Sequence, residues 1–118
     1  MSEKQEIGTI VQWQGLNQIN DNIIFIRYRN KITDDGATIS ELFLTRGNQL
    51  SGELHDLIDK IAHHYFGRFN YENEEIEVFY GGDSKSNYDE AFAYICQIVS
   101  IIYGLMDYGE EFSGKFIN

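Results

Sequence analysis

The apolar side chains in the last third of the chain recur so densely that they cover more than half of the circumference of a helix. No charged residue occurs from Ala91 to Met106. A helix with so wide an apolar surface is typical of a domain interior. A membrane-spanning helix needs roughly 20 predominantly apolar residues, and this run is shorter, interrupted by Gln97 and flanked by acids. We therefore predict a buried, central helix from Ser86 to Tyr108.

The first turn of this helix contains residues that commonly cap helices. Asn87 precedes Glu90 by three positions, and Ser86 precedes Asp89 in the same way, so either pair can satisfy the first free backbone N–H groups. Small and polar side chains form a narrow strip along the helix, at Ala93, Gln97, Ser100 and Gly104. We expect this strip to face solvent; a strand or a second copy of the chain packed on it is the alternative.

Earlier in the chain, the side chains of two segments alternate with the two-residue period of a β-strand. They are Ile7–Gln14 and Ile23–Arg29, which we expect to pair as a hairpin. Asp35-Gly36 follows, and this dipeptide is typical of the two-residue turn of a type I′ hairpin. We therefore predict a third strand from Ala37 to Arg46 that pairs with the second.

After Gly47-Asn48 the apolar spacing changes to that of a helix. Leu50 to Tyr65 carries one apolar stripe, which predicts an amphipathic helix that ends near Gly67. A short fourth strand is predicted from Glu75 to Tyr80. The order strand, strand, strand, helix, strand, helix (βββαβα) predicts an α+β fold, in which two helices pack on a mostly antiparallel sheet and the C-terminal helix is central.

Length and composition are typical of one globular domain. The chain has 118 residues, of which 42% are hydrophobic and 14% aromatic. We expect a single domain over residues 1–118, with segments 1–6 and 109–118 loosely ordered. The first six residues are polar and lack the pattern of a signal peptide. The only cysteine, Cys96, fits a reducing compartment, so we expect the protein in the cytoplasm.

The chain carries a net charge of −10, and this charge is uneven. Residues 1–50 hold six acids and five bases, which gives −1, whereas residues 51–118 hold thirteen acids and four bases, which gives −9. Nucleic acids and anionic membrane surfaces attract basic proteins. The charge therefore argues against direct nucleic-acid or membrane binding and favours a basic protein as the partner.

Tyrosines are interleaved with the acids of the C-terminal half. Tyrosine supplies a large contact area at low entropy cost, and carboxylates steer a basic partner toward the surface. Both features recur where one protein recognises another. The candidate partner-binding residues are Tyr71, Glu72, Glu74, Glu75, Glu77, Tyr80, Asp107, Tyr108, Glu110 and Glu111.

A second hypothesis places a small ligand or a nucleotide at the loop before the central helix. Its candidate residues are Gly81, Gly82, Lys85 and Ser86. The loop lacks the glycine and lysine spacing of a phosphate-binding loop, and Asp83 and Glu90 would repel a phosphate there. A protein of this kind could form a homo-oligomer through the strip of small residues on the central helix.

A third hypothesis is a metal-dependent enzyme. His55, Asp59 and His63 are spaced four apart and share one helical stripe, so they are candidate ligands for a divalent metal. The sequence specifies no further metal ligand, and no arrangement of a nucleophile with a general base stands out. The surroundings of Cys96 in the sequence are not electropositive, as a reactive thiolate requires. We therefore expect no enzymatic activity and no cofactor.

The favoured hypothesis is a small acidic intracellular protein that inhibits or neutralises a basic partner. Such a partner would be a nuclease or another nucleic-acid-binding effector, whose basic surface the acids would cover as a nucleic-acid mimic does. In size and acidity the chain resembles immunity proteins against nuclease toxins and phage-encoded anti-defence proteins. That resemblance is one of general character, and no family motif supports it.

Overall fold

A computed structural model of the chain describes residues 7–13, 23–46 and 52–117, and within them the side chains other than those of 43–46, 52–53 and 105–117. These residues form five strands and three helices. The strands are β1 (Thr9–Trp13), β2 (Ile23–Arg27), β3 (Lys31–Thr33), β4 (Arg68–Asn70) and β5 (Glu75–Phe79). The helices are α1 (Ala37–Arg46), α2 (Gly52–His64) and α3 (Tyr88–Ile117).

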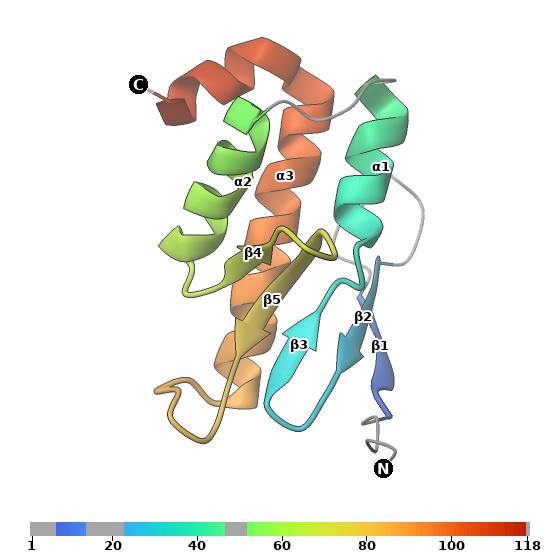
Figure 1. The fold of residues 1–118 in the computed structure, drawn as a ribbon, viewed down its shortest axis with the longest axis vertical. Helices are drawn as coiled ribbons and strands as arrows, with labels where there is room; N and C mark the ends of the chain where they lie inside the picture. Colours follow the sequence, from blue (N-terminus) through green and yellow to red (C-terminus); the bar gives the residue numbers. More distant parts are fainter. Residues whose placement is uncertain (1–6, 14–22, 47–51, 118) are drawn as a thin grey trace.

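The five strands form one sheet in the order β1-β2-β3-β5-β4, and every neighbouring pair is antiparallel. The three helices lie together on one face of this sheet (Figure 1). Apolar side chains of alternate strand positions, such as Phe25, Ile32 and Val78, are fully buried on that face. The predicted α+β class and the predicted hairpin between the first two strands are confirmed.

Helix α3 lies between α1 and α2 (Figure 1), and its apolar side packs into the core. Ile95, Ile98 and Ile102 are fully buried, as the wide apolar surface predicted. The capping residues are also confirmed. The Asn87 side chain accepts the Glu90 N–H at 2.8 Å, and the Glu90 carboxylate accepts the Asn87 N–H at 2.9 Å. The central helix therefore begins where its sequence indicates.

The predicted third strand from Ala37 to Arg46 is wrong, because this segment forms α1. The turn before it has the positive φ angles that a hairpin turn requires, 58° at Asp35 and 80° at Gly36. However, the Asp34 carboxylate accepts the N–H groups of Gly36 and Thr38, both at 3.0 Å, and so caps the first turn of a helix. The chain therefore leaves the sheet after the three residues of β3.

Asp34 also ties α1 to the sheet. Its carboxylate accepts the N–H of Ile76 in β5 at 2.9 Å, and its own N–H donates to the Ile76 carbonyl at 3.2 Å. The Asp34 side chain is buried. Burial raises the pKa of Asp34 above its ordinary value of 3.8, although the hydrogen bonds from Thr38, Ile76 and Gly36 act in the opposite direction. One buried carboxylate therefore joins β3, α1 and β5.

Helix α2 ends near Gly67, as predicted, but Gly67 is not the residue with the left-handed backbone conformation. The left-handed residue is Phe66, with φ of 63°, and the N–H of Gly67 donates to the Ala62 carbonyl at 2.8 Å. Gly67 is required for another reason: a Cβ there would lie 2.8 Å from the Ile98 Cδ1 atom and 2.9 Å from the Glu77 carbonyl oxygen. The glycine lets α2 and β4 approach α3 closely, and the phenylalanine makes the turn.

Two further segments differ from their sequence interpretation. Residues 68–70 form β4, a strand that was not predicted from the sequence. Helix α3 continues through residues 109–117, which we expected to be loosely ordered. Residues 1–6, with the same expectation, lie outside the described residues. In the part of the chain that is described, no helix combines the length and the hydropathy needed to cross a bilayer.

We expect Asp34→Ala to destabilise the fold by about 2–4 kcal/mol, because it removes a helix cap and leaves the buried Ile76 N–H without an acceptor. Glu41→Ala is the matched control, since Glu41 is an exposed carboxylate on the same helix and such substitutions change stability by about 0.5 kcal/mol or less. Urea unfolding measures both. Equal destabilisation by the two variants would show that Asp34 does not hold α1 to the sheet.

Candidate functional site

Part of the predicted partner-binding surface lies at the turn between β4 and β5. Tyr71, Glu72 and Glu74 are exposed there, and the Tyr71 side chain is 50% exposed. The Tyr71 hydroxyl donates to the Asp56 carboxylate of α2 at 3.5 Å. We call Asp56, Tyr71, Glu72 and Glu74 the turn surface. It presents one aromatic side chain beside three carboxylates.

The backbone of this turn is fixed by hydrogen bonds. The Asn70 side chain accepts the Glu72 N–H at 3.0 Å, and the Asn73 side chain accepts the Glu75 N–H at 3.0 Å. The Glu74 N–H donates to the Asn70 carbonyl at 2.8 Å, and Glu74 has a φ of 59°. Asparagine side chains that bond two residues onward favour tight turns. The carboxylates of the turn surface are therefore presented by an ordered backbone.

Tyr71 is held by aromatic neighbours. Its ring centroid lies 5.0 Å from that of Phe69 and 5.7 Å from that of His55, with edge-to-face geometry in both pairs. Burial and the nearby carboxylates of Asp59 and Asp56 raise the pKa of Tyr71. The hydroxyl therefore stays protonated at neutral pH and can donate a hydrogen bond. The His55 Nε2 atom lies 3.7 Å from the Glu74 carboxylate.

Two predicted members of this surface are buried, so the expectation that they are exposed is wrong. Glu77 is 1% exposed and Tyr80 is 7% exposed. The Tyr80 hydroxyl donates to the Tyr28 carbonyl and accepts from the Arg27 Nε atom at 3.2 Å. Strand alternation places Tyr80 on the face that the helices cover, together with Ile76 and Val78. Substitutions at these two positions would therefore alter the fold as well as any surface.

Glu77 lies on the opposite face of the sheet, where cations from the two neighbouring strands enclose it. Its carboxylate accepts from Lys31 of β3 at 3.0 Å and from Arg68 of β4 at 2.8 Å. Burial raises the pKa of Glu77, but the hydrogen bonds from Lys31 and Arg68 outweigh it and hold the pKa below its usual 4.5. Its neighbour Glu75 is partly buried and accepts the Thr33 hydroxyl at 2.7 Å.

The remaining candidate acids lie in the last part of α3. They are the acids Asp107, Glu110 and Glu111, together with Tyr108. Their side chains lie outside the described ones, so their partner-binding role stays a prediction. Within the strip of small residues earlier on the same helix, Ala93 and Gln97 are exposed, and the Ser100 hydroxyl donates to the Cys96 carbonyl at 2.7 Å. That strip faces outward, as expected.

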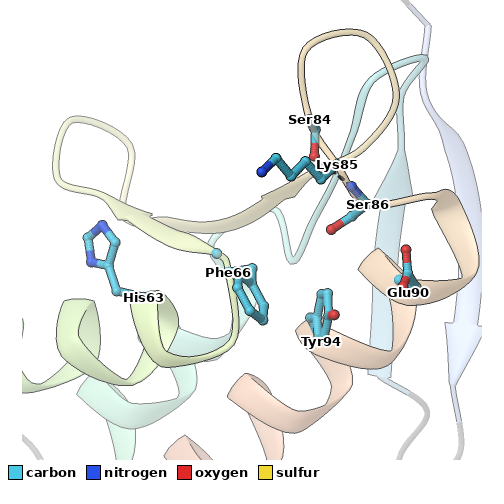
Figure 2. Close-up of a pocket in the computed structure, with 8 residues that line it drawn as sticks. His63, Phe66, Ser84, Lys85, Ser86, Glu90 and Tyr94 are labelled. Carbon is cyan, nitrogen blue, oxygen red and sulfur yellow. Dashed lines mark hydrogen bonds between the residues drawn. The ribbon is translucent and has the colours of Figure 1, made fainter.

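The alternative ligand loop lies beside a cavity. Gly81 and Gly82 both have positive φ, 69° and 54°, and shape the loop. Lys85 and Ser86 line a cavity of about 560 Å³, together with Phe66 from the turn after α2 and Tyr94 from α3 (Figure 2). The predicted residues are thus divided: the two glycines turn the chain, and the other two face the cavity.

The predicted metal ligands do not converge. His55 packs against Phe69, with ring centroids 5.5 Å apart. The Asp59 carboxylate accepts the Phe69 N–H at 3.2 Å, and its other oxygen lies 3.4 Å from the His63 Nδ1 atom. Among the described residues, which include all three, no group of three or more His, Cys, Asp or Glu side chains is placed to hold a metal ion. Asp59 instead joins α2 to β4.

Cys96 is buried in α3, and burial raises the pKa of its thiol to about 12. The thiol is therefore protonated at physiological pH, and a protonated thiol is a poor nucleophile. Its side chain instead belongs to the hydrophobic core.

Comparisons with family models, with curated proteins and with solved structures give no match to this chain. Evidence on function therefore comes from the residues themselves. Sequence reasoning missed three of them, His55 and Asp56 as neighbours of Tyr71 and Phe66 as a cavity residue. The sequence carries no signal that Phe66 is the left-handed residue at the helix end, because the adjacent Gly67 is the residue type usually found there.

We expect the Glu77 ion pairs to make the free energy of unfolding decrease in acid. Because the folded pKa of Glu77 is depressed, its contribution is fully present above about pH 4.5 and is lost as the pH falls through the folded pKa. Glu77→Gln should lower the free energy of unfolding at pH 7 by about 1–3 kcal/mol, a modest loss because Lys31 and Arg68 can be rehydrated. The loss should be smaller at pH 3, where the Glu77 ion pairs of the parent are already weakened. Urea unfolding at both pH values measures this; a Glu77→Gln penalty as large at pH 3 as at pH 7, or an equal effect of exposed Glu72→Gln, would contradict it.

Proposed function

We propose that this protein is a small acidic binding protein that inhibits or neutralises a basic protein partner through the turn surface. The observation that carries the proposal is the half-exposed Tyr71 ring, held by Phe69 and His55 and placed beside three carboxylates. An ordered aromatic with carboxylates around it combines an anchor with a source of attraction for a cation.

The order of the turn supports tight binding. A surface that is fixed before contact loses little conformational entropy on association. Three side-chain and backbone hydrogen bonds fix residues 70–75, and the Tyr71 ring has two aromatic contacts. The partner would therefore meet Tyr71 and the flanking carboxylates already in place.

The charge distribution supports the nature of the partner. The C-terminal half, which includes the turn surface, carries −9 of the net −10. A field of this sign steers basic surfaces toward the protein over distances of about a Debye length, roughly 8 Å at physiological salt. The nucleic-acid-binding face of a nuclease or of another effector has the matching charge. Carboxylates on the turn would occupy the positions that phosphates take, and the bound protein would block that face.

The cytoplasm is the compartment that this proposal implies. A partner that acts on nucleic acid inside the cell must be met there. The protonated, buried thiol of Cys96 is in keeping with a reducing compartment.

Charge reversal tests the steering. We expect Glu72→Lys/Glu74→Lys to lower the association rate with a basic nuclease that binds the parent by about tenfold or more at low salt, with a weaker salt dependence. Asp83→Lys/Asp89→Lys is the control, because it changes the net charge equally in the segment that follows β5, whereas the turn surface precedes β5. If the control slows association as much as the turn variant does, the turn surface is not the contact.

Truncation of Tyr71 tests the anchor. Tyr71→Ala should raise the dissociation rate by about tenfold or more, equivalent to about 2 kcal/mol, with little change in the association rate. Tyr71→Phe keeps the ring and removes only the 3.5 Å hydrogen bond to Asp56, so it should retain most of the affinity. Surface plasmon resonance separates the two rates. An unchanged dissociation rate for Tyr71→Ala would exclude the tyrosine as an anchor.

A further inference from the structure

Phe66 occupies a backbone position that usually belongs to glycine. Its N–H donates to the His63 carbonyl at 3.1 Å, and the next N–H, of Gly67, donates to the Ala62 carbonyl at 2.8 Å. This pair of bonds defines a helix end whose left-handed residue is normally Gly or Asn. Phe66 has a φ of 63° at that residue. A bulky side chain in this region strains the backbone.

The packing of Phe66 does not compensate for this strain. The side chain is 70% exposed, the largest exposure among the described aromatic residues. Its ring lies 5.0 Å from that of Tyr94 on α3. Strained positions that give little stability are concentrated at functional sites. The exposed ring therefore calls for a role other than packing.

The two rings form the wall of the cavity beside the loop that precedes α3. Its volume of about 560 Å³ is within the usual range for small-molecule sites, about 300–1,000 Å³. In Figure 2 the loop that carries Ser84 and Lys85 lies above the rings of Phe66 and Tyr94, and the Lys85 ammonium group extends across the mouth on the side of His63. Helix, loop and helix thus converge on one hollow.

The loop is fixed, although Lys85 itself is exposed. The Gly81 N–H donates to the Ser86 carbonyl at 2.9 Å, and the Ser84 hydroxyl donates to the Phe79 carbonyl at 3.1 Å. Lys85 forms no ion pair with the described residues. The Lys85 ammonium group on this ordered loop therefore offers a ligand one cation next to the aromatic wall.

We propose that this cavity binds a small planar aromatic molecule that carries a single negative charge. The ring of the ligand packs against Phe66 and Tyr94, and its carboxylate pairs with Lys85. Glu90 also lines the cavity, with one oxygen bonded to the Asn87 N–H. Its negative charge disfavours a dianion such as a nucleoside monophosphate. This site is separate from the turn surface and does not depend on the proposed function.

An NMR titration of the full chain with 2-naphthoate tests the proposal, with neutral 2-naphthamide and dianionic adenosine monophosphate as comparison probes. We expect 2-naphthoate to shift the amide signals of Phe66, Lys85, Ser86 and Tyr94, and to bind at least tenfold more tightly than either comparison probe. Tighter binding of adenosine monophosphate or equal binding of 2-naphthamide would overturn the charge assignment. Shifts confined to the exposed isoleucines of β1 and β2 would overturn the site.

Two variants separate a binding role from a packing role. Phe66→Gly should weaken 2-naphthoate binding at least tenfold and raise the thermal midpoint by about 2–5 °C, because glycine accepts the positive φ. Lys85→Met should abolish the preference for naphthoate over naphthamide, whereas Lys60→Met, an exposed lysine of α2, should keep it. A lower midpoint for Phe66→Gly would show that Phe66 is a packing residue, and unchanged binding would exclude the aromatic wall.

Discussion

The buried carboxylate of Asp34 is the interaction on which the arrangement of helices and sheet depends. It accepts N–H groups from the start of α1 and from Ile76 of β5, which lies 42 residues further along the chain. A buried amide without an acceptor costs about 1–3 kcal/mol, so this bond decides that the chain leaves the sheet at Asp34 and begins a helix. The helix then packs its apolar side, including Ile39 and Leu42, against α3.

Strand β5, which Asp34 holds at one end, positions both surfaces with a proposed role. The turn surface precedes β5, and the loop with Lys85 follows it. On the face away from the helices, Glu77 links β5 to its two neighbours through Lys31 and Arg68. The two surfaces lie at opposite ends of the sheet (Figure 1), so the two proposed roles do not compete for the same residues.

The sequence correctly predicted those elements that depend on residues close together in the chain. The apolar surface of α3, its Asn87–Glu90 cap and the first hairpin all follow from short-range spacing. The prediction failed at 37–46 because positive φ at Asp35 and Gly36 suits a hairpin turn and a helix start equally, and the deciding acceptor bond to Ile76 is long-range. Burial of Glu77 was likewise set by cations on other strands. The cavity was not predicted because glycine is the residue usually found at a helix end. The sequence therefore pointed to Gly67 and gave no role to Phe66.

Native-state hydrogen exchange at the Ile76 amide tests the central role of Asp34 most directly. This amide has the Asp34 carboxylate as its acceptor and is buried. The account predicts that Ile76 and Thr38 exchange only through global unfolding, with the same free energy as core amides such as that of Ile98. Exchange of Ile76 at the fast rate of an exposed turn amide such as that of Tyr71, in a folded protein with a protected Ile98, would contradict it.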